Sequence, residues 1–167
     1  MIRVFYKELL HDDPALLAAA DRVGQRVFEF SEYIVDVLGV TDVSSYVDPR
    51  SDPALMKVTY HEACHLRREL GIEAQPRTLI SSCPKTKLIE MGQAEVCCGF
   101  GGTFAVKYPE ISGAMLQDKI DNIRDSEADT VVACDSTCLM HIAGGLEKQN
   151  VPVECVHLAQ LLDEAIE

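Results

Sequence analysis

The chain has 167 residues, and its 15 lysines and arginines stand against 27 aspartates and glutamates, so its formal net charge at pH 7 is −12. Such an acidic surface repels phosphate backbones and argues against nucleic-acid binding. Hydrophobic residues make up 47% of the chain, which suits one globular domain. No apolar run approaches the roughly 20 residues of a transmembrane segment, and the first residues do not resemble a secretory signal. We therefore expect a cytoplasmic protein.

The first part of the chain is expected to be helical. Pro14 follows two aspartates and favours a helix start, and apolar residues recur at helical spacing over 15–30. The apolar face continues over 31–38, and these helices are also a candidate interface between subunits. Residues 41–57 are expected to form a surface connection.

From residue 58 onward, short strands alternate with helices. Strands are expected at 58–61, 87–91, 130–133 and 151–156, and helices at 76–81, 109–124, 136–148 and 158–166. Such alternation with short loops favours parallel pairing. The predicted fold class is α/β, a layered parallel β-sheet with helices on its faces, preceded by an N-terminal helical segment. We expect a helical segment at 1–57 and a cysteine-rich domain at 58–167, together one globular unit.

All seven cysteines lie after residue 63, at positions 64, 83, 97, 98, 134, 138 and 155. In a reducing compartment they should remain thiols or thiolates. Cys64 and Cys134 follow expected strands, Cys138 lies a few residues further on, and the Cys97-Cys98 pair lies in the connection after a third strand. Ligands of parallel sheets gather at the carboxyl ends of strands, so these thiols are predicted to converge at one edge.

The adjacent pair lies in the segment Cys97-Cys98-Gly99-Phe100-Gly101-Gly102. Neighbouring side chains of a regular strand point to opposite faces, so both thiols can serve one site only if the backbone turns. The three glycines permit that turn and let amide N–H groups approach sulfur. Adjacent thiols fit a single zinc tetrahedron poorly and favour a site with several metal atoms.

These motifs resemble the cysteine-rich CCG domain family, which includes a component of heterodisulfide reductase and the iron–sulfur subunits of glycolate and glycerol-3-phosphate oxidation systems. The family pattern is one Cys, then Cys-Cys-Gly, then Cys-x-x-Cys. The segments at 60–66, 97–104 and 138–142, with the helical lead-in at 32–40, look most like its lactate-utilisation branch. Members of that branch typically carry two such motifs, and the single motif here corresponds to the second.

The resemblance implies an iron–sulfur electron-transfer component of a system that oxidises L-lactate or a similar 2-hydroxy acid. It implies a [4Fe–4S] cluster, non-cubane in some relatives, and other subunits of a redox complex as partners. The implied metal ligands are Cys64, Cys97, Cys98 and Cys138, with Gly99, Gly101 and Gly102 shaping the loop. The last pair, Cys134 and Cys138, is one residue longer than the family spacing, which leaves the role of Cys134 open between ligand and bystander.

Two other functions use the same thiols. A zinc-binding structural or assembly module would use the four thiolates without redox chemistry, and a thiol–disulfide reductase would cycle them directly. Cys83 and Cys155 are interpreted as structural. His61 and His65 are more often structural than ligands in such a position, and His141 is a candidate for contact with the ligands from one helical turn beyond Cys138.

Overall fold

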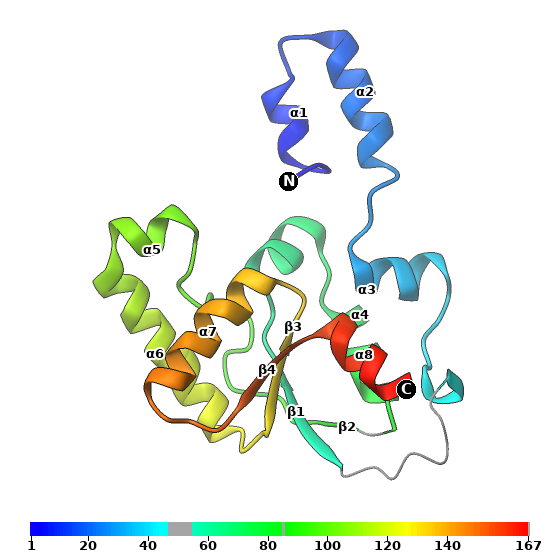
Figure 1. Ribbon diagram of the computed structural model, residues 1–167. Coiled ribbons are helices and arrows are strands. Elements are labelled where there is room, and N and C mark those ends of the chain that lie inside the picture. Colours follow the sequence, from blue (N-terminus) through cyan, green and yellow to red (C-terminus); the bar gives the residue numbers. More distant parts are fainter. Residues whose placement is uncertain (47–54, 85, 167) are drawn as a thin grey trace.

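The protein is described by a computed structural model that covers residues 1–46, 55–84 and 86–166. Four parallel strands form one sheet in the order β2-β1-β3-β4 (Figure 1). Their bounds are β1 (Met56–Tyr60), β2 (Thr86–Leu88), β3 (Thr130–Ala133) and β4 (Glu154–His157). The strand order reverses between β1 and β3, and ligands of such sheets bind at that position. The α/β fold expected from the sequence is confirmed.

Helices cover both faces of the sheet. α4 and α8 pack together on one face, and α6 and α7 pack together on the other (Figure 1). The bounds are α4 (Ala74–Ser82), α5 (Thr103–Lys107), α6 (Pro109–Asp125), α7 (Ser136–Lys148) and α8 (Leu158–Ile166). Each face has its own core cluster. Val132 of β3 belongs to the α4–α8 cluster and Val131 to the α6–α7 cluster, because side chains alternate between the faces of a strand.

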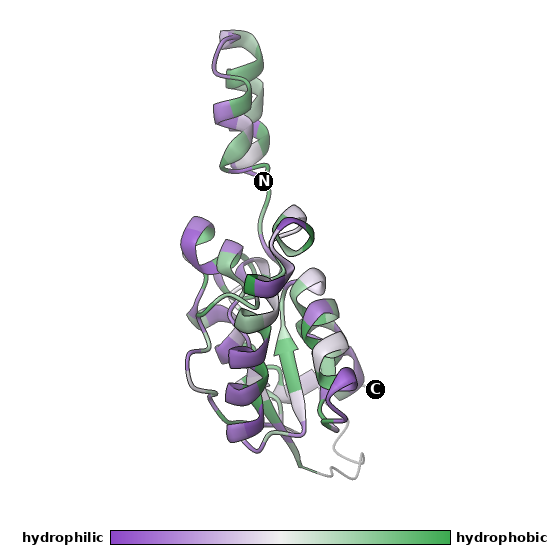
Figure 2. Cartoon of the chain, turned by 90° about the vertical axis from the view of Figure 1, so that its left-hand side faces the viewer, coloured by the Kyte–Doolittle hydropathy of each residue, from purple (hydrophilic) through white to green (hydrophobic). Residues whose placement is uncertain are grey.

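The N-terminal residues form a helical hairpin, α1 (Phe5–Leu9) and α2 (Pro14–Gly24), that stands off the rest of the protein (Figures 1 and 2). Asp13 caps α2 by accepting hydrogen bonds from the backbone N–H groups of Ala15 and Leu16, so the start predicted at Pro14 is confirmed.

The helix expected over 15–30 ends earlier, at Gly24. A new helix, α3 (Phe30–Glu32), begins after Glu29, whose side chain accepts from the N–H groups of Ser31 and Glu32. The Glu32 carboxylate accepts in turn from the Glu29 N–H, which completes a capping box. The capping box starts a second helix within the stretch expected to form one helix. Glu32 also pairs with Arg3 at 2.6 Å and ties the chain start to α3.

Three short helices complete the connections. They are η1 (Tyr33–Val37), η2 (Ser44–Tyr46) and η3 (Leu66–Leu70). α3 and η1 together account for the helical stretch expected over 31–38. The surface connection expected at 41–57 falls partly on residues 47–54, which lie outside the described residues.

The strands differ from expectation only at their ends. β2 covers 86–88 instead of 87–91, and β4 begins at Glu154 instead of Val151. Pro152 has no N–H to donate to a ladder, which explains the late start of β4. The helices α6 and α7 match their predictions to within one residue at each end.

Candidate metal centre

Three segments that are far apart in the chain bring cysteines to the carboxyl ends of β1 and β3. Cys64 follows β1, Cys97 and Cys98 lie in the connection between β2 and α5, and Cys138 lies in the first turn of α7, just after β3. The ligand atoms of Cys98, Cys138 and His61 all lie within 4.8 Å of one another. Cys64 contacts Cys97. The four cysteines named from the sequence therefore meet at one edge of the sheet.

The backbone turns sharply at the adjacent cysteines. Gly99, Gly101 and Gly102 have φ angles of 91°, 51° and 58°, which L side chains rarely adopt. The N–H of Gly99 points to the Sγ of Cys97 at 3.4 Å. A Cβ atom at Gly99 would lie 2.6 Å from the carbonyl oxygen of Ser112 on α6. The glycines thus allow the turn predicted from the sequence and a close approach of the loop to α6.

The thiols of Cys98 and Cys138 lie in contact with each other. Against the effect of burial, the hydrogen bond from Cys138 holds the pKa of Cys98 well below its usual range, helped by His61. The same contact and burial raise the pKa of Cys138. The opposite shifts show that the two thiols contact each other. A metal ion would bind here in place of thiol protons, because thiolates are the form that binds metals.

Cys64 is half-buried, and its pKa is raised by burial and then by its contact with Cys97.

The start of α7 is held by Asp135, which accepts from the N–H groups of Thr137 and Cys138 at 2.9 Å each. This cap sets the first helical turn and with it the position of Cys138.

Cys134 has different neighbours. The hydroxyl of Tyr60 donates to its Sγ at 3.8 Å. Burial, followed by the nearby Glu29, raises the pKa of the Cys134 thiol to about 12. Among the described residues, Cys134 does not belong to the group of three ligand atoms within 4.8 Å of one another, and neither do Cys64 and Cys97. Cys134 packs against both core clusters.

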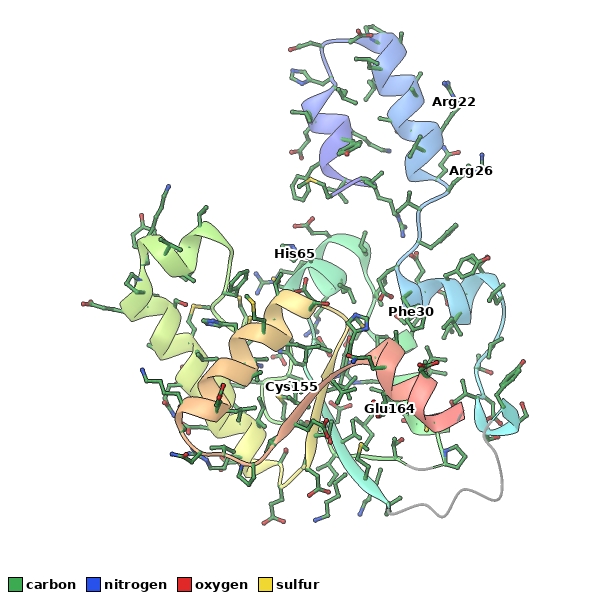
Figure 3. The ribbon with its side chains drawn as sticks, viewed as in Figure 1. Arg22, Arg26, Phe30, His65, Cys155 and Glu164 are labelled. Carbon is green, nitrogen blue, oxygen red and sulfur yellow. The ribbon has the colours of Figure 1, made fainter. Side chains whose placement is uncertain are left out.

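The remaining cysteines pack as hydrophobic residues. Cys83 is buried in the α4–α8 cluster. Cys155 lies on β4 (Figure 3), packs against the α6–α7 cluster, and has a pKa raised by burial to about 11. Both positions agree with the structural role expected from the sequence.

The histidines occupy three different environments. His61 directly follows β1 and has no exposed surface. His65 is exposed near the start of η3 (Figure 3). His141 lies 3.4 Å from the hydroxyl of Ser112, and its ring is 5.7 Å from that of Phe100 in the glycine-rich loop. Sequence reasoning gave His61 little weight, although its place at the end of a strand matches that of the cysteines.

A buried lysine holds the segment that leads to the adjacent cysteines. Lys119 of α6 is 1% exposed, and its Nζ donates to the carbonyl oxygens of Gln93 at 2.6 Å and Ala94 at 3.3 Å. Burial lowers the pKa of Lys119. The helical spacing of α6 puts Lys119 on its apolar face, but no functional role could be predicted for it, because a charged side chain on an amphipathic helix usually faces solvent.

A buried carboxylate lies next to His61. Glu62 is 5% exposed, and its Oε1 lies 2.6 Å from Nη1 of Arg77 and its Oε2 3.0 Å from Nη1 of Arg67. The two guanidinium groups neutralise the charge of Glu62, so its carboxylate is paired with arginines and not with the thiols.

The model of the cysteine-rich CCG domain matches residues 58–143, which is more than half of the chain. This protein therefore belongs to the cysteine-rich CCG domain family. The described residues contain no helix with both the length and the apolar character needed to cross a membrane.

Among curated proteins, the chain is similar to several named lactate utilization protein A. It is 40% identical over 161 residues to the one from Exiguobacterium sp., covering 96% of this chain and 63% of the relative. It is 34% identical over 158 residues to that of Lysinibacillus sphaericus, covering 95% and 66%. A lactate utilization protein A 2 from Bacillus mycoides is 37% identical over 158 residues, covering 95% and 63%. The chain thus spans slightly less than two thirds of the length of these relatives.

Proposed function

We propose that this protein is an iron–sulfur electron-transfer component of a system that oxidises L-lactate or a similar 2-hydroxy acid. The convergence of thiols from three segments at one sheet edge is the observation that supports it most. The names of its relatives supply the substrate class.

Cys64, Cys97, Cys98 and Cys138 are the proposed ligands, and the proposed cluster is of the [4Fe–4S] type. The residues fit such a group by their chemistry. Soft thiolates favour iron–sulfur clusters, and two adjacent cysteines can reach different metal atoms. When bound, the cluster would accept and pass on single electrons.

The chain's own residues would position the cluster and tune its potential. The Gly99 N–H that points to Cys97, and the Phe100 N–H that lowers the pKa of Cys98, would both stabilise negative charge on sulfur. Removal of the hydroxyl proton and hydride from the substrate is assigned to another protein of the redox complex. This division of work makes other subunits the proposed partners.

The test is anaerobic reconstitution with ferrous iron and sulfide, followed by iron and sulfide analysis and absorption and electron paramagnetic resonance spectra. The wild type should bind both, and Cys98→Ser should lose most of the bound iron. Cys83→Ser is the matched control, because Cys83 lies in the core away from the site. In a host that depends on this protein, Cys98→Ser should also stop growth on lactate. A wild type without iron and sulfide would refute the proposal.

Zinc binding is the second candidate. The nitrogen and two sulfur atoms of His61, Cys98 and Cys138 match the ligand types of structural zinc sites. The same preparation distinguishes the two functions, because a zinc module would be colourless, bind about one zinc per chain and unfold on chelation.

A further inference from the structure

His61 is a fully buried side chain whose ring nitrogens have no nitrogen or oxygen partner among the described residues. It is 0% exposed, neither Nδ1 nor Nε2 makes a hydrogen bond of ordinary geometry within the described residues, and the ring lies beside the thiol of Cys98. Burying an imidazole in this way is unfavourable, and buried polar groups in native proteins nearly always have a partner. A bound metal ion would give the ring of His61 the partner that it lacks.

The backbone fixes where the ring can point. The N–H of His61 donates to the carbonyl oxygen of Val132 at 2.8 Å, so the chain continues the β1–β3 ladder for one residue beyond Tyr60. Consecutive residues of a strand face opposite sides. Tyr60 belongs to the α4–α8 cluster, whereas His61 faces Cys98 and Cys138, which belong to the α6–α7 cluster.

The ring nitrogen and the two sulfur atoms lie close enough to share a metal. Metal–nitrogen and metal–sulfur bonds are about 2.0 to 2.3 Å long, and the three ligand atoms lie within 4.8 Å of one another. The other histidines of the region are weaker candidates for this ligand position, because His65 is exposed and His141 contacts Ser112.

We propose that His61 is a metal ligand, so that an imidazole nitrogen binds beside the thiolates of Cys98 and Cys138. The inference rests on the proposed metal site and adds a donor of a different kind. A neutral imidazole brings one negative charge less than a thiolate. In iron–sulfur centres, histidine in the place of a cysteine ligand raises the reduction potential. A site whose additional donor is an imidazole is therefore expected to accept an electron more readily than one whose additional donor is a thiolate.

The first experiment uses wild-type protein and needs no substitution. Protein labelled with ¹⁵N at histidine is reconstituted anaerobically with iron and sulfide, reduced, and examined by pulsed electron paramagnetic resonance. Hyperfine coupling to one histidine nitrogen is expected. A spectrum without nitrogen coupling from a protein that does contain iron and sulfide would overturn the inference and leave the proposed function standing.

The second experiment measures zinc binding and is independent of iron. His61→Gln, which keeps a polar side chain of similar size, should weaken zinc affinity by at least tenfold, and His65→Gln should leave it unchanged. Circular dichroism of each variant reports whether the fold is kept. Equal zinc affinity of wild type and a folded His61→Gln protein would contradict the inference, and a wild type that binds neither iron nor zinc would refute both proposals.

Discussion

The hydroxyl of Tyr60 lies 3.8 Å from the sulfur of Cys134, on the face of the sheet opposite to the one His61 takes. Cys134 packs against both core clusters, but among the described residues its printed side-chain partner is Tyr60 and not a thiol. We infer that Cys134 is a structural residue, and Cys138 a ligand.

Substitution of these two cysteines should have different effects on metal content. Cys134→Ala removes a half-buried sulfur beside Tyr60 and should cost about 1 kcal/mol of stability, with iron binding unchanged. Cys138→Ala should lose at least half of the bound iron, because a proposed ligand is gone. Iron analysis after anaerobic reconstitution measures both. Loss of iron in a folded Cys134→Ala protein would instead make Cys134 a ligand.

Gly99 should tolerate no side chain. Gly99→Ala places a Cβ 2.6 Å from the carbonyl oxygen of Ser112 at a φ of 91°, and should lower the free energy of unfolding by about 3 kcal/mol. Gly71 is the matched control, because it also has a positive φ, of 69°, but a Cβ added there would have no heavy atom within 4 Å. Gly71→Ala should cost only about 1 kcal/mol. Urea denaturation checks both, and equal losses would contradict the close approach to α6.

Substitution by alanine of two neighbouring glycines in α7 should change stability in opposite directions. Gly144 is exposed and open around its Cα, so Gly144→Ala should stabilise the protein by about 0.5 to 1 kcal/mol through helix propensity. At Gly145 a Cβ would lie 2.6 Å from Ile120 and 2.9 Å from Leu116 of α6, so Gly145→Ala should destabilise it by about 1 kcal/mol. Thermal denaturation should show the two melting temperatures on opposite sides of the wild type. Stabilisation by both substitutions would mean that α6 and α7 pack less closely.

The contribution of Lys119 to the free energy of unfolding should increase at alkaline pH. Lys119→Met leaves the Gln93 carbonyl without its partner and should cost about 1 to 2 kcal/mol at neutral pH. Because burial lowers the pKa of Lys119 in the folded state, the unfolded chain binds more protons between that pKa and the ordinary value of 10.5. Stability contributed by Lys119 therefore rises with pH in this window. The difference in unfolding free energy between wild type and Lys119→Met, measured from about pH 7 to the ordinary lysine pKa, should widen, and a narrowing difference would contradict the assignment.

Much of the architecture could be predicted because its signals are local. α6 and α7 follow from apolar spacing, and Thr130–Ala133 follows from a short β-prone run. The early end of α2 at Gly24 could not be predicted from the apolar pattern, because that pattern continues to Phe30, which is the first residue of α3. The division of the chain at residue 57 stays a prediction.

The candidate site could be predicted in part. The convergence of Cys64, Cys97, Cys98 and Cys138 followed from placing cysteines after strands. The separation of Cys134 from His61 depends on which face each strand-end residue takes, and that required the register of β1 against β3, in which Tyr60 pairs with Val132. Spacing along the chain carries no information on this pairing.

The pairing of β1 with β3 also sets an order of events during synthesis. Cys64 leaves the ribosome more than seventy residues ahead of Cys138, which corresponds to roughly 4 to 15 s at bacterial or eukaryotic translation rates. Until β3 and α7 follow, the nascent chain cannot assemble this sheet edge, and its early thiols are open to oxidants and stray metal ions. Insertion of the metal cluster is therefore expected to take place after translation.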